Sequence, residues 1–347
     1  MIFYFFSTPL IYRGTFAFFL SLVLFLILGK RLIKWLKRKK MVDYFRLYSP
    51  LTHKLKKGTP SGGGLFILFC LGLSFILLGN ITNRYLYLAL LATFSLGFLG
   101  FVDDVAKRVR KNSKGLSIKT KLLLQVGVSI FIAFCIYYLI TDINTGVIVP
   151  FTNLQIKLGI FYLPFIAFII LSFSNAVNIS DGLDGLTAGC MIAPAFFFII
   201  VCFAGKTVNL SFLFNRTGAV GVDELAFFWL ALLAALIGFL RYNRYPATLF
   251  MGGVGAEALG GALAISGILL KMELLLLLIG GVFVIEALSV VLQVISYRLT
   301  GKRIFKIAPL HHHFELNGAK ESSIVSGFWV TSAFFSIVAF LSLILVR

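Results

Sequence analysis

Long apolar runs alternate with short polar segments along nearly the whole chain. A helix that crosses a bilayer needs about 20 predominantly apolar residues, and runs of roughly 17 to 25 are tolerated. The runs that meet this criterion are centred near residues 15–30, 62–79, 85–102, 121–140, 159–174, 187–204, 226–241, 254–270, 274–297 and 326–346. The pattern therefore predicts an all-α integral membrane protein with about ten transmembrane helices.

Two segments need a separate interpretation. The first run has no small-residue cleavage site and precedes a dense basic segment, so we expect an uncleaved anchor and not a signal peptide. Residues 144–156 place β-branched side chains between turn-forming residues, which predicts a small exposed β-hairpin.

The composition indicates a protein that is solvated mainly by lipid. The chain has 347 residues, of which 59% are hydrophobic and 13% charged, and its mean hydropathy is +0.99. No polar segment is long enough for a separate soluble core, so we expect residues 1–347 to form a single polytopic membrane domain. All the cysteines, Cys70, Cys135, Cys190 and Cys202, lie in apolar runs and are expected to be buried hydrophobic residues.

The net charge of +19 has two interpretations, a nucleic-acid partner or a signal for membrane topology. Of the 32 lysines and arginines, 25 fall in the loops that follow the odd-numbered runs. Because basic loops stay in the cytoplasm, this asymmetry predicts cytoplasmic odd-numbered loops and two periplasmic termini. It explains the charge without a nucleic acid. The unusual polar chemistry then falls on the cytoplasmic face, where we expect the active site.

The loop that holds Asn175, Asn178, Asp181 and Asp184 carries no lysine or arginine. It lies between two apolar runs, and an uncompensated carboxylate at that depth is costly, which indicates a functional role. The spacing does not fit an EF-hand. Magnesium suits it better, because this ion takes one or two carboxylates and completes its shell with water and phosphate oxygens. Hydrogen bonding to a base and ribose is a further role, and an ordinary loop closed by Asx-turns is the structural alternative.

Asp103 and Asp104 are adjacent at a predicted membrane boundary. Neighbouring carboxylates raise each other's proton affinity unless a cation lies close by. A divalent metal ion, or a phosphate bridged by one, explains why both are tolerated. The alternative is an i,i+4 helix pair between Asp103 and Lys107, which leaves Asp104 without a role.

The glycine-rich segment Gly58–Gly64 follows Lys54, Lys56 and Lys57 and opens a predicted helix. Free backbone N–H groups and the helix dipole make such a segment a candidate phosphate cradle. The alternative is a flexible helix entry flanked by lysines that set the topology. Elsewhere on the same face, Asn243 and Phe250 offer an amide and an aromatic ring to a nucleobase, although aromatic residues at membrane edges are commonly anchors.

Three of the four histidines, His311, His312 and His313, are consecutive. On an extended loop they point in alternating directions, so we expect hydrogen bonds to phosphate oxygens and not a shared metal ion. One of them is alternatively a structural histidine. Together, these loops hold the carboxylates, lysines, amides and histidines typical of metal-assisted phosphoryl transfer.

At these residues the chain resembles the phospho-N-acetylmuramoyl-pentapeptide transferase family of the polyprenyl-phosphate N-acetylhexosamine-1-phosphate transferases. The paired aspartates and the NxxDGLDGL pattern are typical of the superfamily, and the triple histidine is typical of the muramoyl-pentapeptide branch. The matching motifs are GTPSGGG at 58–64, FVDD at 101–104, KGLSIKTKLLLQ at 114–125, NAVNISDGLDGL at 175–186, YNRYPATLFMGG at 242–253 and PLHHHFE at 309–315.

The resemblance implies ten transmembrane helices, often in a homodimer, in the bacterial inner membrane. It implies a cytoplasmic cleft in which phospho-MurNAc-pentapeptide passes from UDP-MurNAc-pentapeptide to undecaprenyl phosphate, with Mg²⁺ as cofactor. The products are lipid I, a precursor of peptidoglycan, and UMP.

The resemblance also implies roles for single residues. Asp103 deprotonates or orients the lipid phosphate, or acts as a covalent nucleophile. The metal ligands are expected among Asp103, Asp104, Asp181 and Asp184. The phosphates are expected to contact Lys56, Ser61, Asp104, Lys107 and Lys119, and the sugar-phosphate side to contact His311, His312 and His313. The nucleotide and metal region is expected to be lined by Asn175, Asn178, Asp181, Asp184, Asn243, Phe250 and Gln293.

Gly253 is the main departure from the family pattern, which has an aspartate there that resembles the principal magnesium ligand. Ala256 and Glu257 also depart from the usual Ser-Leu, and Ser61 and Gly62 stand where Thr-Met is usual. The sequence therefore leaves open an impaired enzyme, or a homologue that binds nucleotide or lipid without catalysis. Two alternatives are weaker. The histidine motif disfavours a sister UDP-N-acetylglucosamine-1-phosphate transferase. The absence of an internal repeat disfavours an ion-coupled transporter.

Overall fold

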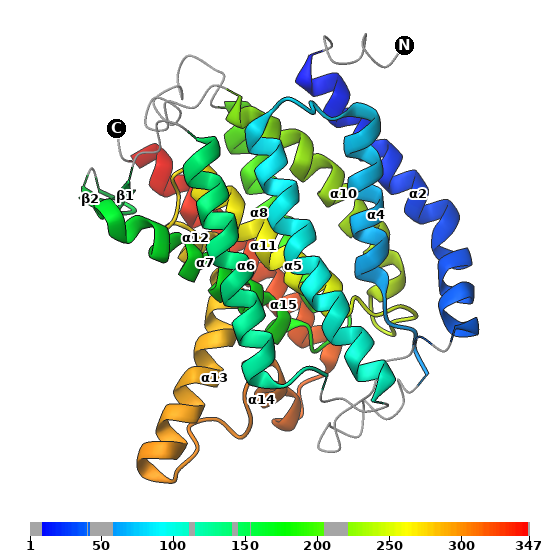
Figure 1. Cartoon of the computed structure of the whole chain (residues 1–347). Helices are drawn as coiled ribbons and strands as arrows, with labels where there is room; N and C mark the ends of the chain where they lie inside the picture. Colours follow the sequence, from blue (N-terminus) through cyan, green and yellow to red (C-terminus); the bar gives the residue numbers. More distant parts are fainter. Residues whose placement is uncertain are drawn as a thin grey trace.

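Lipid-facing apolar runs fold as helices because a helix satisfies every backbone polar group within one segment. The computed structural model describes residues 9–39, 41, 58–110, 115–140, 145–152, 154–204 and 221–345. Within these ranges the chain is a bundle of long helices (Figure 1), which confirms the predicted all-α membrane fold. The predicted phosphate ligand Lys56, together with Lys54, Lys57 and Lys114, lies outside the described residues.

Nine of the ten predicted runs each coincide with one main helix, and the run 274–297 covers two, Leu276–Ile279 and Gly281–Thr300. Eight of these helices are long and apolar enough to cross a membrane, and two, α4 and α11, are shorter apolar helices. The long helices are α2 (Leu10–Arg38), α4 (Gly63–Leu78), α5 (Arg84–Val109), α6 (Ile118–Leu139), α7 (Tyr162–Ser180), α8 (Leu186–Ala204), α10 (Leu225–Asn243), α11 (Gly253–Leu269), α13 (Gly281–Thr300) and α15 (Glu321–Leu345). The number of spans and their orientation remain predictions.

Short elements complete the described chain. They are the α-helices α12 (Leu276–Ile279) and α14 (Leu310–Leu316), the 3-10 helices η1 (Gly159–Phe161) and η2 (Val222–Glu224), and the strands β1 (Gly146–Ile148) and β2 (Gln155–Lys157). The two strands pair antiparallel with Val147 opposite Ile156, which confirms the predicted hairpin.

Helix α11 forms the centre of the bundle, and all of its residues are buried. A helix that is apolar on every face belongs in the interior. Its neighbours approach closely because the contacts are made by glycines. A Cβ added to Gly64 of α4 would lie 2.2 Å from the backbone nitrogen of Gly255, and one added to Gly100 of α5 would lie 2.3 Å from the carbonyl oxygen of Gly253.

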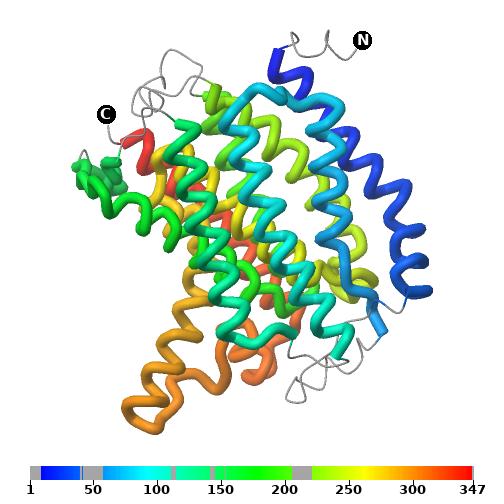
Figure 2. The backbone as a smooth tube through the Cα atoms, viewed as in Figure 1, coloured from blue at the N-terminus to red at the C-terminus, as the bar shows by residue number. Residues whose placement is uncertain are grey.

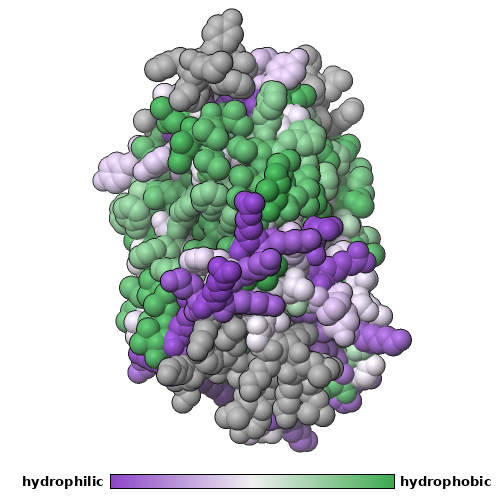
Figure 3. Space-filling model, turned by 90° about the vertical axis from the view of Figure 1, so that its right-hand side faces the viewer, coloured by the Kyte–Doolittle hydropathy of each residue, from purple (hydrophilic) through white to green (hydrophobic). Residues whose placement is uncertain are grey.

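The outer surface carries the apolar side chains that face lipid. Figure 3 shows a broad apolar belt with hydrophilic side chains gathered toward one end of the molecule. The last turns of α2 contribute exposed basic residues there, namely Lys30, Arg31, Lys34, Lys37, Arg38 and Lys39.

The described chain begins and ends at the same end of the bundle, where α2 starts and α15 finishes (Figure 1). At that end a buried ion pair between Arg13 and Glu224 joins α2 to η2. At the other end α13 projects away from the remaining helices (Figure 2), and its second half is largely exposed.

The glycine contact between α4 and α11 gives a stability prediction. We expect Gly64→Ala to destabilise the protein by about 1–3 kcal/mol, because its Cβ would meet backbone atoms that cannot rotate away. Gly127→Ala, on α6, is the matched control. A Cβ at Gly127 meets nothing within 4 Å, so this change should be neutral or stabilising by about 0.5–1 kcal/mol. Thermal unfolding in detergent measures both, and equal losses for the two variants would contradict the packing argument.

Candidate active site

The predicted site residues gather at the end of the bundle from which α13 projects, where α5 ends and α6 and α11 begin (Figure 1). Asp103 and Asp104 lie in the last turns of α5. Lys107 contacts both carboxylates, with its Nζ 2.9 Å from Asp103 Oδ2 and 3.0 Å from Asp104 Oδ1. The i,i+4 pair between Asp103 and Lys107 is therefore confirmed, and Asp104 shares the same lysine.

The remaining carboxylate oxygens are held by backbone groups. The N–H of Leu116 donates to Asp103 Oδ1 at 2.9 Å. The chain approaches this closely because Gly115 adopts φ +59°, and a Cβ there would lie 2.4 Å from the same oxygen. The N–H of Val254 donates to Asp104 Oδ2 at 3.3 Å, so Asp104 faces the positive end of the α11 dipole.

A second lysine, Lys121 of α6, lies on the other side of Asp103. Its Nζ is 3.6 Å from Asp103 Oδ2 and 2.6 Å from Oε1 of the completely buried Glu257. Gln125 donates from Nε2 to Glu257 Oε2 at 3.2 Å and accepts from Asn175 Nδ2 at 3.0 Å. The predicted residue Asn175 thus reaches Asp103 through three side chains.

In the glycine-rich segment, the N–H groups of residues 61–64 donate to backbone carbonyls and not to an anion. The N–H of Ser61 donates to Met41, those of Gly62 and Gly63 to Phe250, and that of Gly64 to Met251. The cradle hypothesis is therefore wrong for residues 61–64, where the segment serves to dock α4 against the segment before α11. This docking brings Ser61 close to Asp104, since a Cβ on Gly252 would lie 2.8 Å from Ser61 Oγ and 2.9 Å from Asp104 Oδ2.

Asp184 and Asn243 organise the loop between α7 and α8. Asp184 is buried and its Oδ2 accepts from the N–H of Ala247 at 2.9 Å. Asn243 is also buried; its Oδ1 accepts from the N–H of Gly185 at 3.0 Å, and its Nδ2 donates to the Leu249 carbonyl. These contacts tie the end of α10 to the aspartate loop.

The three histidines lie on a helix, α14, and not on an extended loop. His311 is buried, and Glu286 of α13 accepts from its backbone N–H at 3.2 Å and lies 3.0 Å from its Nδ1. Among the described residues the other ring nitrogen, Nε2, has no hydrogen-bond partner, and it packs against Gly182 of the aspartate loop. Glu286 fixes the His311 ring, and the role of His311 at the sugar-phosphate side stays a prediction.

The other two histidines are half-buried. His312 Nδ1 lies 2.6 Å from Glu315 Oε2, and His313 Nδ1 accepts from the N–H of Lys306 at 3.2 Å. Gln293 accepts from the N–H groups of residues 304 and 305, so it fixes the connection between α13 and α14.

Three further predicted residues lie on or next to α6 and α7. Asn178 and Asp181 are half-buried, on α7 and at its C-cap. Lys119 is exposed in the first turn of α6, and the lysine of α6 that contacts Asp103 is Lys121.

The donor set does not fit a metal ion held by protein side chains. Across the described ranges, no group of three or more His, Cys, Asp or Glu side chains is placed to bind a metal. Asp103 and Asp104 both pair with Lys107. At Gly253 a Cβ would lie 3.0 Å from Asp104 Oδ1, so a side chain at this position would point at the aspartate pair.

An apolar groove of about 460 Å³ runs between α13, α14 and α15. The histidine helix contributes Leu310 and Phe314 to its wall, and α15 contributes Ile324 and Phe328. Its lining is almost entirely apolar, and two of its residues belong to the helix that carries the histidines.

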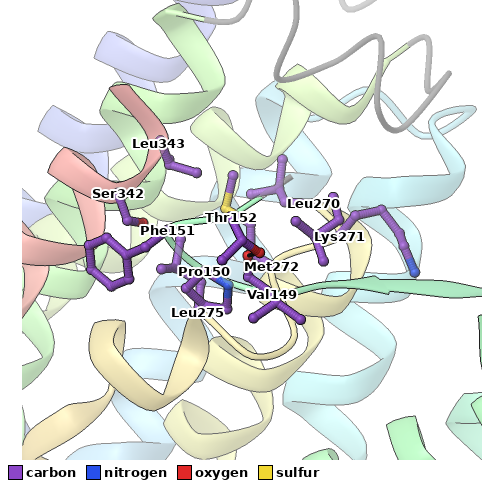
Figure 4. A pocket seen from close by; sticks show the side chains of 11 residues that line it. Val149, Pro150, Phe151, Thr152, Leu270, Lys271, Met272, Leu275, Ser342 and Leu343 are labelled. Carbon is purple, nitrogen blue, oxygen red and sulfur yellow. Dashed lines mark hydrogen bonds between the residues drawn. The ribbon is translucent and has the colours of Figure 1, made fainter. Parts of the chain in front are cut away.

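A second cavity, of only about 40 Å³, lies beside the β-hairpin (Figure 4), at the end of the bundle where α15 finishes (Figure 1). The hairpin turn and residues 270–275 line it, and the Lys271 amine points away from it toward Glu273 and Tyr162. Burial lowers the pKa of Lys271, while Glu273 opposes that shift. This cavity is too small for an organic substrate.

Comparison with known proteins shows the family. Residues 86–271 match glycosyl transferase family 4. A phospho-N-acetylmuramoyl-pentapeptide-transferase of Solidesulfovibrio magneticus is 43% identical over 329 residues, which cover 94% of this chain and 91% of that protein. This chain belongs to the phospho-N-acetylmuramoyl-pentapeptide transferase family. The protein of the same name from Buchnera aphidicola is 40% identical over 336 residues, 96% of this chain and 99% of its own length. The resemblance inferred from the motifs is confirmed.

Sequence reasoning missed two carboxylates and one cation that organise the transferase site. Glu286 clamps His311, Glu321 accepts from the N–H of Asp184 at 2.9 Å, and Lys121 contacts Asp103. One signal was available. Glu286 is an isolated carboxylate in an apolar run, and the cost of burying a carboxylate, argued for the loop of Asp181 and Asp184, applies to it as well.

The packing of His311 on Gly182 gives a second prediction. A Cβ on Gly182 would lie 2.3 Å from His311 Nε2, and Glu286 prevents the ring from moving away. We expect Gly182→Ala to destabilise the protein by about 1–3 kcal/mol. In a His311→Ala background the same change should cost little, because the ring is gone. Thermal unfolding of the four proteins measures the difference, and equal losses in both backgrounds would contradict the contact.

Proposed function

We propose that this chain transfers phospho-MurNAc-pentapeptide from UDP-MurNAc-pentapeptide to undecaprenyl phosphate, yielding lipid I and UMP. The observation that carries the proposal is the Asp103–Asp104–Lys107 cluster, held against the first turn of α11 in a chain of this family. Carboxylates and lysines in fixed positions suit phosphoryl transfer, where catalysis depends on positioning and charge stabilisation.

The two substrates would approach the cluster from different sides. The apolar groove between α13, α14 and α15 would hold the polyprenyl chain and leave its phosphate beside the histidine helix. The nucleotide would lie toward Asn175, Asn178, Asn243 and Phe250, which supply amides and an aromatic face. His312 and His313 would contact the sugar-phosphate side.

The reaction exchanges one phosphoanhydride for another. An oxygen of the lipid phosphate attacks the phosphorus that carries the sugar, and the bond from that phosphorus to the UMP oxygen breaks. Asp103 orients the attacking phosphate and takes its proton where one is present, since Leu116 and Lys107 fix both of its oxygens. Lys107 stabilises the charge that develops on the transferred group.

The family uses a divalent metal ion, and Mg²⁺ is the predicted cofactor, but the side chains of this site do not form a ligand set for it. The carboxylate that the family pattern places at residue 253 is absent. Any Mg²⁺ would therefore depend on substrate phosphates, with Asp103, Asp104, Asp181 or Asp184 as protein ligands. When bound, such an ion supplies charge neutralisation to the phosphates.

We further propose that residues 1–347 act as one membrane domain in the bacterial inner membrane, with the site facing the cytoplasm. The distribution of basic residues supports this orientation. A homodimer is the proposed assembly, on the strength of the family resemblance alone.

A transfer assay in detergent tests the function and the role of Gly253 together. With UDP-MurNAc-pentapeptide, polyprenyl phosphate and Mg²⁺, we expect lipid I and UMP from both the wild type and Gly253→Asp. The aspartate should raise kcat by about 10-fold or more, because it adds a ligand next to Asp104. Binding of Mn²⁺, followed by electron paramagnetic resonance, should tighten in parallel. If both forms act only on another UDP-sugar, the muramoyl assignment is wrong.

Asp103→Asn tests the proposed base. We expect kcat to fall by about 100-fold or more, because the amide cannot accept a proton. Binding of UDP-MurNAc-pentapeptide, measured by calorimetry, should change little. Undiminished turnover would remove Asp103 from the mechanism.

A further inference from the structure

Glu257 and Lys121 form an ion pair that the proposed reaction does not itself use. The Lys121 Nζ lies 2.6 Å from Glu257 Oε1, and the glutamate has no exposed surface. A carboxylate buried inside an apolar helix is costly unless it is paired, so this contact fixes where the lysine can stand. The lysine side chain remains 20% exposed and also reaches to 3.6 Å from Asp103 Oδ2.

The pair belongs to a continuous line of side chains across four helices. Lys121 and Gln125 are one turn apart on α6 and so face the same side. Both contact Glu257 of α11, and Gln125 continues to Asn175 of α7. The line therefore joins Asp103 of α5 to the helix that precedes the aspartate loop.

The charges of the cluster indicate what Lys121 does. Three carboxylates, Asp103, Asp104 and Glu257, face two lysines, Lys107 and Lys121. The contacts of Lys121 are to carboxylates, and the cluster retains a net negative charge. Lys121 is anchored by the buried Glu257, with its Nζ 2.6 Å from Glu257 Oε1. Its position between Glu257 and Asp103 suits a group that orients the latter.

We propose that Glu257 and Lys121 are positioning residues that fix the position of the Asp103 carboxylate relative to Asn175. The ion pair with Glu257 keeps the Lys121 amine from moving closer to Asp103. Gln125 links Glu257 to Asn175 of α7 by hydrogen bonds. This inference rests on the proposed function, because it assigns the pair to the orientation of the proposed base.

Four variants separate a positioning role from a merely structural one. Lys121→Met leaves Glu257 buried without its cation, so we expect a lower melting temperature and a lower kcat. Lys121→Met with Glu257→Leu removes both charges and should recover the melting temperature, while kcat stays about 10-fold or more below the wild type. KM for both substrates should stay within about 2-fold. Lys121→Arg should recover part of kcat, and Lys157→Met, which removes an exposed lysine of β2, should match the wild type.

Wild-type kcat in the double variant would overturn the proposal and leave the proposed function intact. Failure of the wild type and of Gly253→Asp to transfer any sugar phosphate would instead overturn the proposed function. A thermal cycle of Asp103→Asn and Lys121→Met then decides the inference independently of activity. Non-additive shifts in melting temperature would show that Lys121 holds Asp103, and additive shifts would exclude it.

Discussion

A carboxylate at the edge of a lipid-embedded bundle must find a cation or a hydrogen-bond donor, and this requirement organises the whole site. Asp103 and Asp104 share Lys107, and Glu257 takes Lys121. These pairs bind the end of α5 and the start of α6 to the start of α11. The packing of the helices at this end therefore depends on these ion pairs.

The same requirement appears at the histidine helix. Glu286 is a buried carboxylate, and its partners are the backbone and ring of His311. The clamp sets α14 against Gly182, so the histidines and the aspartate loop form one wall. Two buried glutamates, Glu257 of α11 and Glu286 of α13, thus hold together residues that lie far apart in the sequence.

The membrane fold could be predicted from the sequence because lipid imposes a simple rule on chain composition, and the predicted runs coincide with the main helices. The hairpin was predictable for a similar local reason. The hydrogen-bond partners of the backbone groups could not be predicted. The N–H groups of Gly62 and Gly63 look free in the motif, yet the Phe250 carbonyl, nearly two hundred residues away, accepts both. The Lys121–Glu257 contact likewise depends on how α6 and α11 pack, which no local pattern encodes.

The groove between α13, α14 and α15 has a consequence for how the protein would meet its lipid. A polyprenyl chain in such a groove exchanges with lipid in the plane of the bilayer and does not pass through water. Occupancy then depends on the mole fraction of the carrier among membrane lipids, and dilution of the whole sample leaves it unchanged. Occupancy by the nucleotide would instead depend on its concentration in the aqueous phase.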